Sequence, residues 1–265
     1  MFPKVNLVDL SIPIKNPADG EMDPTLQESL ACVTKYLTHE DTAGLVSGYF
    51  GCEKDDLLGG VGWATERIRL SSHSGTHIDA PYHYFFESGG KPSNTITECP
   101  LEWFFGNGVV LDMRHIPDGE TAQAGDIEQA LEKIDHKLSY GDIACIRFDT
   151  DKKFGTKEYW SEYPGLSAEA VRYILDQGVK VIGVDSPGFD IPFSTTKKKF
   201  AQSKDRAILW EAHRAGIPYD YSHIEKLANL DKVPPKGFWI VCFPVHIYKA
   251  SAAWARVVAM VPQEL

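Results

Sequence analysis

The chain has 265 residues, of which 43% are hydrophobic and 24% are charged, and this composition predicts one globular domain over residues 1–265. Its formal net charge of −10 at pH 7 argues against nucleic acid or an anionic membrane as a partner, and no apolar run approaches the ~18 residues of a membrane span. The five cysteines are odd in number and lack CxxC spacing, so we expect free thiols in a reducing cytoplasm.

The N-terminal quarter of the chain predicts one strand followed by a long surface excursion. Residues 5–14 alternate apolar and polar side chains, as in a half-buried strand. Residues 15–60 are polar and rich in Gly, Pro and acidic residues, with a helix indicated over residues 26–37. We expect this excursion to cover substrate or to contact another subunit. A strand is predicted over residues 64–70, where arginines alternate with apolar residues.

The next segment places three of the nine histidines and one aspartate within eleven residues. These four residues all occupy odd positions, so an extended chain would point them towards one side. A helix would also pair two of the histidines at i, i+4, but nearby Gly75, Pro81 and β-branched residues oppose a helix. We therefore expect a kinked loop that aims these side chains at one point. The four residues are His73, His77, Asp79 and His83.

Two imidazoles and a carboxylate suit a borderline divalent cation such as Zn²⁺, Mn²⁺ or Fe²⁺. Three protein ligands leave coordination positions for water and substrate, which is typical of a catalytic site rather than a structural one. The structural alternative is a set of loop histidines that are satisfied by hydrogen bonds. The clustering of the four residues favours the metal site.

Downstream of this loop, short apolar segments alternate with amphipathic ones, which predicts a layered α/β fold. Asp126 is expected to cap one helix, and Ser167 a second helix that ends at Gly178. A third helix is expected over residues 205–215, ended by Gly216. The expected strands cover residues 109–112, 143–148, 179–184, 239–243 and 255–261. Periodicity does not give the order of these strands in a sheet.

A second group of candidate residues lies in the last quarter of the chain, where His213 and Glu225 stand twelve positions apart. A histidine near the end of a helix is ordinarily structural, because the helix dipole stabilises its charge. Spacing alone therefore gives these two residues no function.

Residues 73–83 resemble the HxGTHxDxPxH signature of the cyclase-like metal-dependent hydrolases, the family of bacterial kynurenine formamidase and isatin hydrolase. Every fixed position of the signature is met. The resemblance spans nearly the whole chain and implies a swivelling β/β/α fold and a homodimer or homotetramer. The residues beside Trp63 and those before His213 look more like the isatin hydrolase branch. The long stretch between the first strand and the motif departs from the kynurenine formamidases.

The resemblance implies a hydrolase that opens a cyclic amide or cleaves an N-acyl aryl amide with metal-activated water. His73, His77 and Asp79 would bind a divalent metal ion, Mn²⁺ or Zn²⁺. His83 would be the general base and then the acid for the leaving nitrogen. As the resemblance also implies, His213 and Glu225 would act in catalysis, either as ligands of a second metal or as contacts to substrate and water. We expect one metal per subunit.

Aromatic residues crowd the motif, and core packing explains most of them. Trp63, Tyr82 and Phe85 are candidates to line an apolar pocket for an aromatic amide. Three other functions stay open. One is arylformamidase activity. Another is that of a mononuclear iron oxygenase, because two histidines and one carboxylate also form its ligand set. The last is that of a non-catalytic metal-binding protein.

Overall fold

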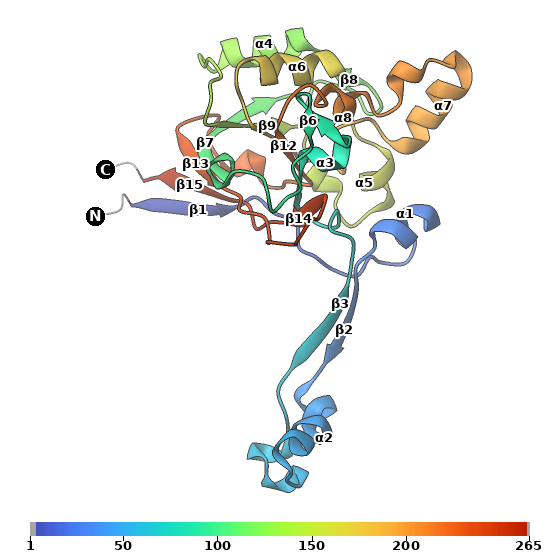
Figure 1. Cartoon of the computed structure of the whole chain (residues 1–265), viewed down its shortest axis with the longest axis vertical. Helices are drawn as coiled ribbons and strands as arrows, with labels where there is room; N and C mark the ends of the chain where they lie inside the picture. The colour runs from blue at the N-terminus through green and yellow to red at the C-terminus, as the bar shows by residue number, and fades with distance from the viewer. Residues whose placement is uncertain (1–3, 264–265) are drawn as a thin grey trace.

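The computed structural model describes residues 4–263 and is built on a nine-stranded mixed sheet (Figure 1). Four neighbouring strands in the middle of this sheet, β7, β9, β11 and β12, run parallel to one another, and the remaining pairings are antiparallel. In spatial order the strands are β1 (Val5–Asp9), β15 (Val258–Pro262), β13 (Phe238–Val241), β7 (Phe105–Asp112), β9 (Asp142–Arg147), β11 (Val181–Val184), β12 (Ser222–Glu225), β4 (His77–Asp79) and β14 (Ala252–Trp254). The prediction of an α/β fold is confirmed.

Helices α4 (Ala124–Lys133) and α6 (Ala168–Asp176) lie side by side over one face of the sheet (Figure 1). Their apolar stripes, which include Ile127 and Ile174, pack against strand residues such as Ile146 in a continuous buried core. A second buried core, mostly aliphatic, includes Trp103, Phe104 and Phe238. Because β9 and β11 are buried on both faces, their sequences read as apolar runs and both strands were predicted, whereas the polar sequence of β12 was not predicted as a strand.

The ends of these two helices show how local sequence sets the boundaries. Ser167 caps α6 as predicted, because its Oγ accepts a hydrogen bond from the Ala170 N–H at 3.1 Å. The predicted cap of α4 is one turn too late. Gln123 is the cap, and Asp126 is the third helical residue, whose carboxylate accepts from the Gln123 N–H at 2.7 Å. Both residues belong to one reciprocal capping box, which explains the misplacement.

The helix predicted over residues 205–215 is wrong as a single element. It is divided into a 3₁₀ turn, Arg206–Ile208, and α8 (Glu211–Ala215). The two are separated at Trp210, whose left-handed backbone (φ 63°) a continuing helix does not allow. Helix α7 (Phe193–Ser203) was not predicted, because it buries no side chain and so carries no clear apolar stripe.

Residues 33–69 form an arm that extends away from the sheet, with helix α2 (His39–Phe50) at its far end (Figure 1). Strands β2 (Val33–Leu37) and β3 (Thr65–Arg69) pair along its length. The predicted helix over residues 26–37 is therefore only partly correct: α1 (Pro24–Leu30) ends before β2 begins. The arm also exposes several large apolar side chains: Val33, Tyr36, Leu45, Tyr49, Phe50, Leu58, Trp63 and Ile68.

The remaining elements are short. One antiparallel hairpin and one parallel pair of short strands lie outside the main sheet, and two short helices flank the loops around its edge. These are β5 (Glu87–Ser88) with β6 (Lys91–Pro92), β8 (Thr121–Ala122) with β10 (Gly165–Leu166), α3 (Pro81–Tyr84) and α5 (Lys157–Ser161). All five cysteines are free thiols, as predicted. Within residues 4–263, no helix combines the length and the apolar character needed to cross a membrane.

Candidate metal centre

The register between β4 and β12 brings the predicted motif and the second candidate group together. Asp79 lies opposite His223, and His77 lies opposite Glu225. Because alternate residues of a strand share a face, these four side chains gather on one side of the sheet. On the other flank of β4, the small side chain of Ala252 lies opposite Asp79. Residues 144 positions apart in the sequence thus meet in one buried site.

A tight turn fixes the orientation of the His77 ring. Gly75 has a left-handed backbone (φ 62°), and a Cβ added there would lie 2.8 Å from a side-chain carbon of Ile14. The turn places the Gly75 carbonyl 2.9 Å from His77 Nδ1. Since a carbonyl can only accept a hydrogen bond, Nδ1 carries the proton and Nε2 presents its lone pair to the site. This is the tautomer that a metal ligand requires.

Asp79 is the centre of the cluster and is fully buried. Its Oδ1 lies 2.8 Å from His73 Nδ1 and 3.3 Å from His77 Nε2. Its Oδ2 lies 2.8 Å from His223 Nε2 and 3.9 Å from His83 Nε2. Burial alone would raise the pKa of Asp79, but the surrounding imidazoles outweigh it and hold this pKa well below its usual range. The carboxylate is therefore ionised.

His213 forms the second half of the site with two carboxylates. Its Nδ1 lies 2.5 Å from Asp190 Oδ2, and its Nε2 lies 3.4 Å from Glu225 Oε1. Burial alone would lower the pKa of His213, but hydrogen bonds to Asp190 and Glu225 raise it to about 10. The Trp210 ring stacks on the His213 ring, with centroids 4.3 Å apart, which also suits a charged imidazole. The left-handed backbone of Trp210 thus serves the site.

His83 lines the same site, but its pKa is shifted in the opposite direction from that of His213. It sits on α3, and its ring centroid is 4.1 Å from that of His73 and 5.6 Å from that of His213. Burial, with the neighbouring imidazoles, lowers the pKa of His83 to about 3, although Asp79 opposes this shift. His83 is therefore neutral near pH 7 and able to accept a proton.

The buried donor atoms of the cluster fit a divalent cation. His77 Nε2 and Asp79 Oδ1 are both buried and make no hydrogen bond within residues 4–263. Two overlapping sets of atoms are close enough to share a metal ion: those of Asp79, His213, His223 and Glu225, and those of His73, Asp79 and His83. Unsatisfied buried polar atoms cost free energy, and a metal ion would satisfy them.

The predicted site residues meet as follows. His73 and His77 both contact Asp79, with His83, His213 and Glu225 around them, but the set close enough to share one ion is His73, Asp79 and His83, and His77 belongs to neither set. His223 and Asp190 also belong to the cluster, although sequence reasoning gave them no role. For His223 a signal existed, because the spacing His223-x-Glu225 puts both on one face of a strand. Asp190 follows no pattern that marks it.

A cavity of about 340 Å³ opens onto the cluster. Its wall includes the aromatic residues Trp160, Tyr163, Phe193 and Trp210. The three residues predicted to contact substrate do not line it. Trp63 lies on the arm, where its ring stacks on Tyr49 with centroids 6.1 Å apart, and Tyr82 and Phe85 are about half exposed. The aromatic wall instead comes from segments far from the motif in sequence.

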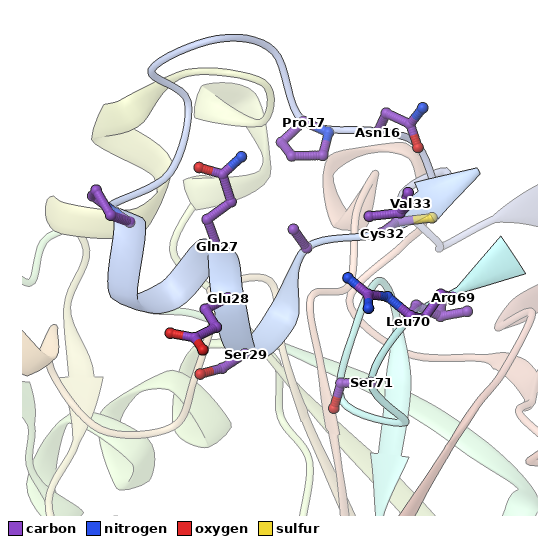
Figure 2. A pocket seen from close by; sticks show the side chains of 12 residues that line it. Asn16, Pro17, Gln27, Glu28, Ser29, Cys32, Val33, Arg69, Leu70 and Ser71 are labelled. Carbon is purple, nitrogen blue, oxygen red and sulfur yellow. The ribbon is translucent and has the colours of Figure 1, made fainter. Parts of the chain in front are cut away.

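A larger groove of about 860 Å³ runs between α1 and the base of the arm (Figure 2). Glu28 and Arg69 face it from opposite sides, and Ser29 belongs to the walls of both this groove and the smaller cavity. Within the described residues, the groove holds none of the clustered metal-binding groups. It is therefore distinct from the candidate metal centre.

Comparisons with known proteins agree with this geometry. A family described as putative cyclase matches residues 8–191. Kynurenine formamidase from Erythrobacter litoralis is 28% identical over 192 residues, which cover 72% of this chain and 74% of that protein. Isatin hydrolase from Roseibium aggregatum is 26% identical over 212 residues, covering 73% of each.

Solved structures show a similar fold. An isatin hydrolase bound to the product analogue thioisatinate has a TM-score of 0.73 at 22% identity, covering 98% of this chain and 93% of that one. Isatin hydrolase A from Labrenzia aggregata, bound to benzyl benzoate, has a TM-score of 0.74 at 22% identity, covering 98% and 94%. The predicted fold type, with its curled mixed sheet, is confirmed.

Proposed function

Because this chain belongs to the putative cyclase family, whose pattern matches residues 8–191, we propose that it is a metal-dependent hydrolase that opens a cyclic amide or cleaves an N-acyl aryl amide. The observation that carries the proposal is the pair of buried atoms His77 Nε2 and Asp79 Oδ1, which face each other without hydrogen bonds. Relatives named isatin hydrolase and kynurenine formamidase both break a carbon–nitrogen bond, which supports this reaction class.

His73, His77 and Asp79 would hold one divalent cation, Mn²⁺ or Zn²⁺. When bound, the cation supplies Lewis acidity, which lowers the pKa of water to about 7 and polarises a carbonyl. Ser251 supports this set, because its Oγ lies 3.1 Å from His73 Nε2. His223 supports it from the other side at Asp79 Oδ2. Such outer contacts orient the ligands and are as necessary as the ligands themselves.

Two histidines, one neutral and one protonated, would carry out the proton transfers. His83 Nε2 is neutral and accepts the proton of the attacking water, then returns it to the leaving nitrogen. His213 carries a proton between Asp190 and Glu225 and faces the same space. Pairs of groups whose pKa values are pushed apart are typical of acid–base catalysis.

The aromatic wall of the cavity supports an aromatic substrate. A volume of about 340 Å³ matches a small bicyclic or monocyclic amide, and Trp160, Tyr163 and Trp210 offer flat apolar surfaces. The solved relatives bound to thioisatinate and to benzyl benzoate also hold aromatic ligands. We therefore assign the substrate to the aryl amides, with cyclic amides preferred.

A homodimer is the assembly that the arm supports best. The arm exposes eight large apolar side chains, and nothing else within residues 4–263 packs against its far end (Figure 1). Leu58, at the tip, is 97% exposed. Exposed apolar surface of this kind ordinarily marks a contact between proteins, and a second copy of the chain is the partner available to every molecule.

The test is a substrate screen on purified protein whose metal content has been measured. Hydrolysis of isatin would support the preferred cyclic-amide activity, and hydrolysis of N-formylkynurenine would support the arylformamidase alternative. The reaction is followed by absorbance, with chelator-treated protein as the control. Turnover that survives complete removal of the metal would overturn the proposal. Absence of turnover on a wider amide panel would favour a non-catalytic metal-binding protein, and oxygen consumption would favour an oxygenase.

A further inference from the structure

Lys226 is a buried lysine with an unusual backbone, directly after β12 and the site residue Glu225. Its side chain is 2% exposed, although lysines are rarely buried without a full set of partners. Its backbone is left-handed (φ 61°), a conformation that residues other than glycine and asparagine rarely adopt. A strained residue at the wall of an active site suggests a role that outweighs its cost.

The turn at Lys226 is held from several sides. Its N–H donates to the Ser186 carbonyl at 3.0 Å, and its own carbonyl accepts from Thr76 Oγ1 at 2.5 Å. The next N–H, that of Leu227, donates to the Val184 carbonyl at 2.9 Å. These bonds fix the backbone, so the direction of the side chain is set by the fold.

The ammonium group of Lys226 lies within the catalytic cluster. Its Nζ donates to the His73 carbonyl at 3.2 Å and to Glu225 Oε2 at 3.4 Å, and Lys226 lines the cavity beside His73, His83 and Glu225. An ammonium has three N–H donors. Within residues 4–263, only these two acceptors are found for it. One donor therefore remains for a ligand.

Charge balance favours an anionic ligand. In the proposed function, on which this inference rests, the two charges of a divalent cation are offset by Asp79 and Glu225. Asp190 offsets the charged His213. Lys226 itself pairs with Glu225 at 3.4 Å, so the excess of one positive charge belongs to the cluster as a whole, in a cavity whose other walls include aromatic and apolar residues. Low local polarity makes an uncompensated charge a strong attraction for an anion.

We propose that Lys226 is a specificity residue that binds a carboxylate of the substrate next to the amide that is cleaved. The substrate class is an aryl amide with an adjacent carboxylate group. The competing account makes Lys226 a structural counterion of Glu225. The two roles predict different kinetics, because loss of a structural counterion should lower kcat/KM equally for neutral and anionic substrates.

The experiment compares two substrates that differ in one charge. N-formylanthranilate carries a carboxylate beside its formamide, and formanilide lacks it. Each is assayed with metal-loaded enzyme, with Lys226→Met, which keeps the length of the stem, and with Lys226→Gly, which also relieves the left-handed backbone. Lys204→Met is the matched control, because Lys204 is an exposed lysine that is also left-handed (φ 55°).

We expect both Lys226 variants to keep their metal and to lose about 10- to 100-fold in kcat/KM for N-formylanthranilate, the range for one charged hydrogen bond. The loss on formanilide should be clearly smaller than the loss on N-formylanthranilate, and Lys204→Met should match the unmodified enzyme. Equal losses on both substrates, or loss of metal from both Lys226 variants, would identify a structural counterion and overturn the proposal.

Binding of benzoate and benzamide, measured by calorimetry, keeps this inference separate from the proposed function. If neither formamide is hydrolysed, the proposed function fails for this substrate class, but benzoate should still bind more tightly than benzamide. That preference should shrink about 10- to 100-fold in Lys226→Met. Equal affinity of the unmodified protein for both compounds would overturn the proposal even if the variants do not fold.

Discussion

His83 and His213 show how neighbouring residues of one type acquire opposite roles. Their ring centroids are only 5.6 Å apart. Burial and the neighbouring imidazoles lower the pKa of His83 to about 3 despite Asp79 at 3.9 Å, whereas hydrogen bonds to two carboxylates raise the pKa of His213 to about 10. Burial disfavours both charged rings, so the partners decide which ring keeps its proton. The sequence could identify both histidines as candidates but not assign these states.

His83→Asn tests the assignment of the base. The variant should retain the metal, because His73, His77 and Asp79 remain, and it should bind substrate with similar affinity. Turnover should fall ~10²–10⁴-fold, the usual value of general-base catalysis. Steady-state kinetics together with elemental analysis measure both quantities. Loss of metal in this variant would make His83 a ligand.

Asp79→Ala tests the centre of the cluster. Asp79 touches four imidazoles, and its removal leaves the ligand set incomplete, so bound metal and activity should both disappear. Asp112→Ala is the control, because Asp112 pairs with Arg114 at the surface. Full metal occupancy in Asp79→Ala, measured by elemental analysis, would contradict the assignment.

Glu225→Gln decides between one metal and two. Glu225 lies close to both His77 and His213. If it positions substrate and water, as we expect, the variant keeps one metal per chain and turns over more slowly. Two metals per chain in the unmodified protein, reduced to one in the variant, would instead place Glu225 in a second metal site.

At the scale of elements, the arm carries the clearest prediction. Leu58→Asp combined with Phe50→Asp puts two charges on its apolar tip, and we expect the dimer to dissociate into monomers. Light scattering after size-exclusion chromatography measures this change. Leu101→Asp is the control, since Leu101 is apolar and 68% exposed, as Phe50 is, but lies outside the arm. A variant with an unchanged mass would show that the arm serves another purpose.

Some secondary-structure elements could be predicted from the sequence and others could not. Buried strands such as β9 and β11 follow from their apolar runs, and α6 follows from its cap and stripe. The break at Trp210 does not, because a left-handed tryptophan is imposed by tertiary contacts that outweigh local preference. The pairing of β2 with β3 was missed because β2 was predicted as part of a helix over residues 26–37, although β3 was predicted as a strand.

At the scale of the whole molecule, the candidate site was predicted in part. The motif in residues 73–83 brought together the three predicted metal ligands and His83 because these four residues are close in sequence. The aromatic wall of the cavity could not be identified, since Trp160 and Phe193 are brought there by the order of strands in the sheet. Strand order depends on long-range packing, which a local pattern does not record.

The charge of His213 also links the site to the stability of the whole fold. In metal-free protein, its pKa of about 10 lies above the ordinary value of 6.5, so the folded state holds the proton more tightly. The stabilisation is complete below pH 6.5 and is lost as pH rises through 10, by on the order of 2–4 kcal/mol. Urea unfolding of chelator-treated protein should show this decline. His213→Asn should lack this decline. If its free energy of unfolding falls equally steeply with pH, the decline does not come from His213.

The antiparallel pairing of β1 with β15 brings the two ends of the described chain together. Val5 lies opposite Pro262, and the Gln263 N–H donates to the Lys4 carbonyl at 2.9 Å. The first and last described residues are therefore neighbours at one edge of the sheet. A short linker could join these ends, and new ends could be opened at Gly59 and Gly60 on the tip of the arm. In such a circular permutant, the residues of the metal centre would keep their sequence order within one continuous chain. Synthesis would begin at a different residue, but the site would be the same.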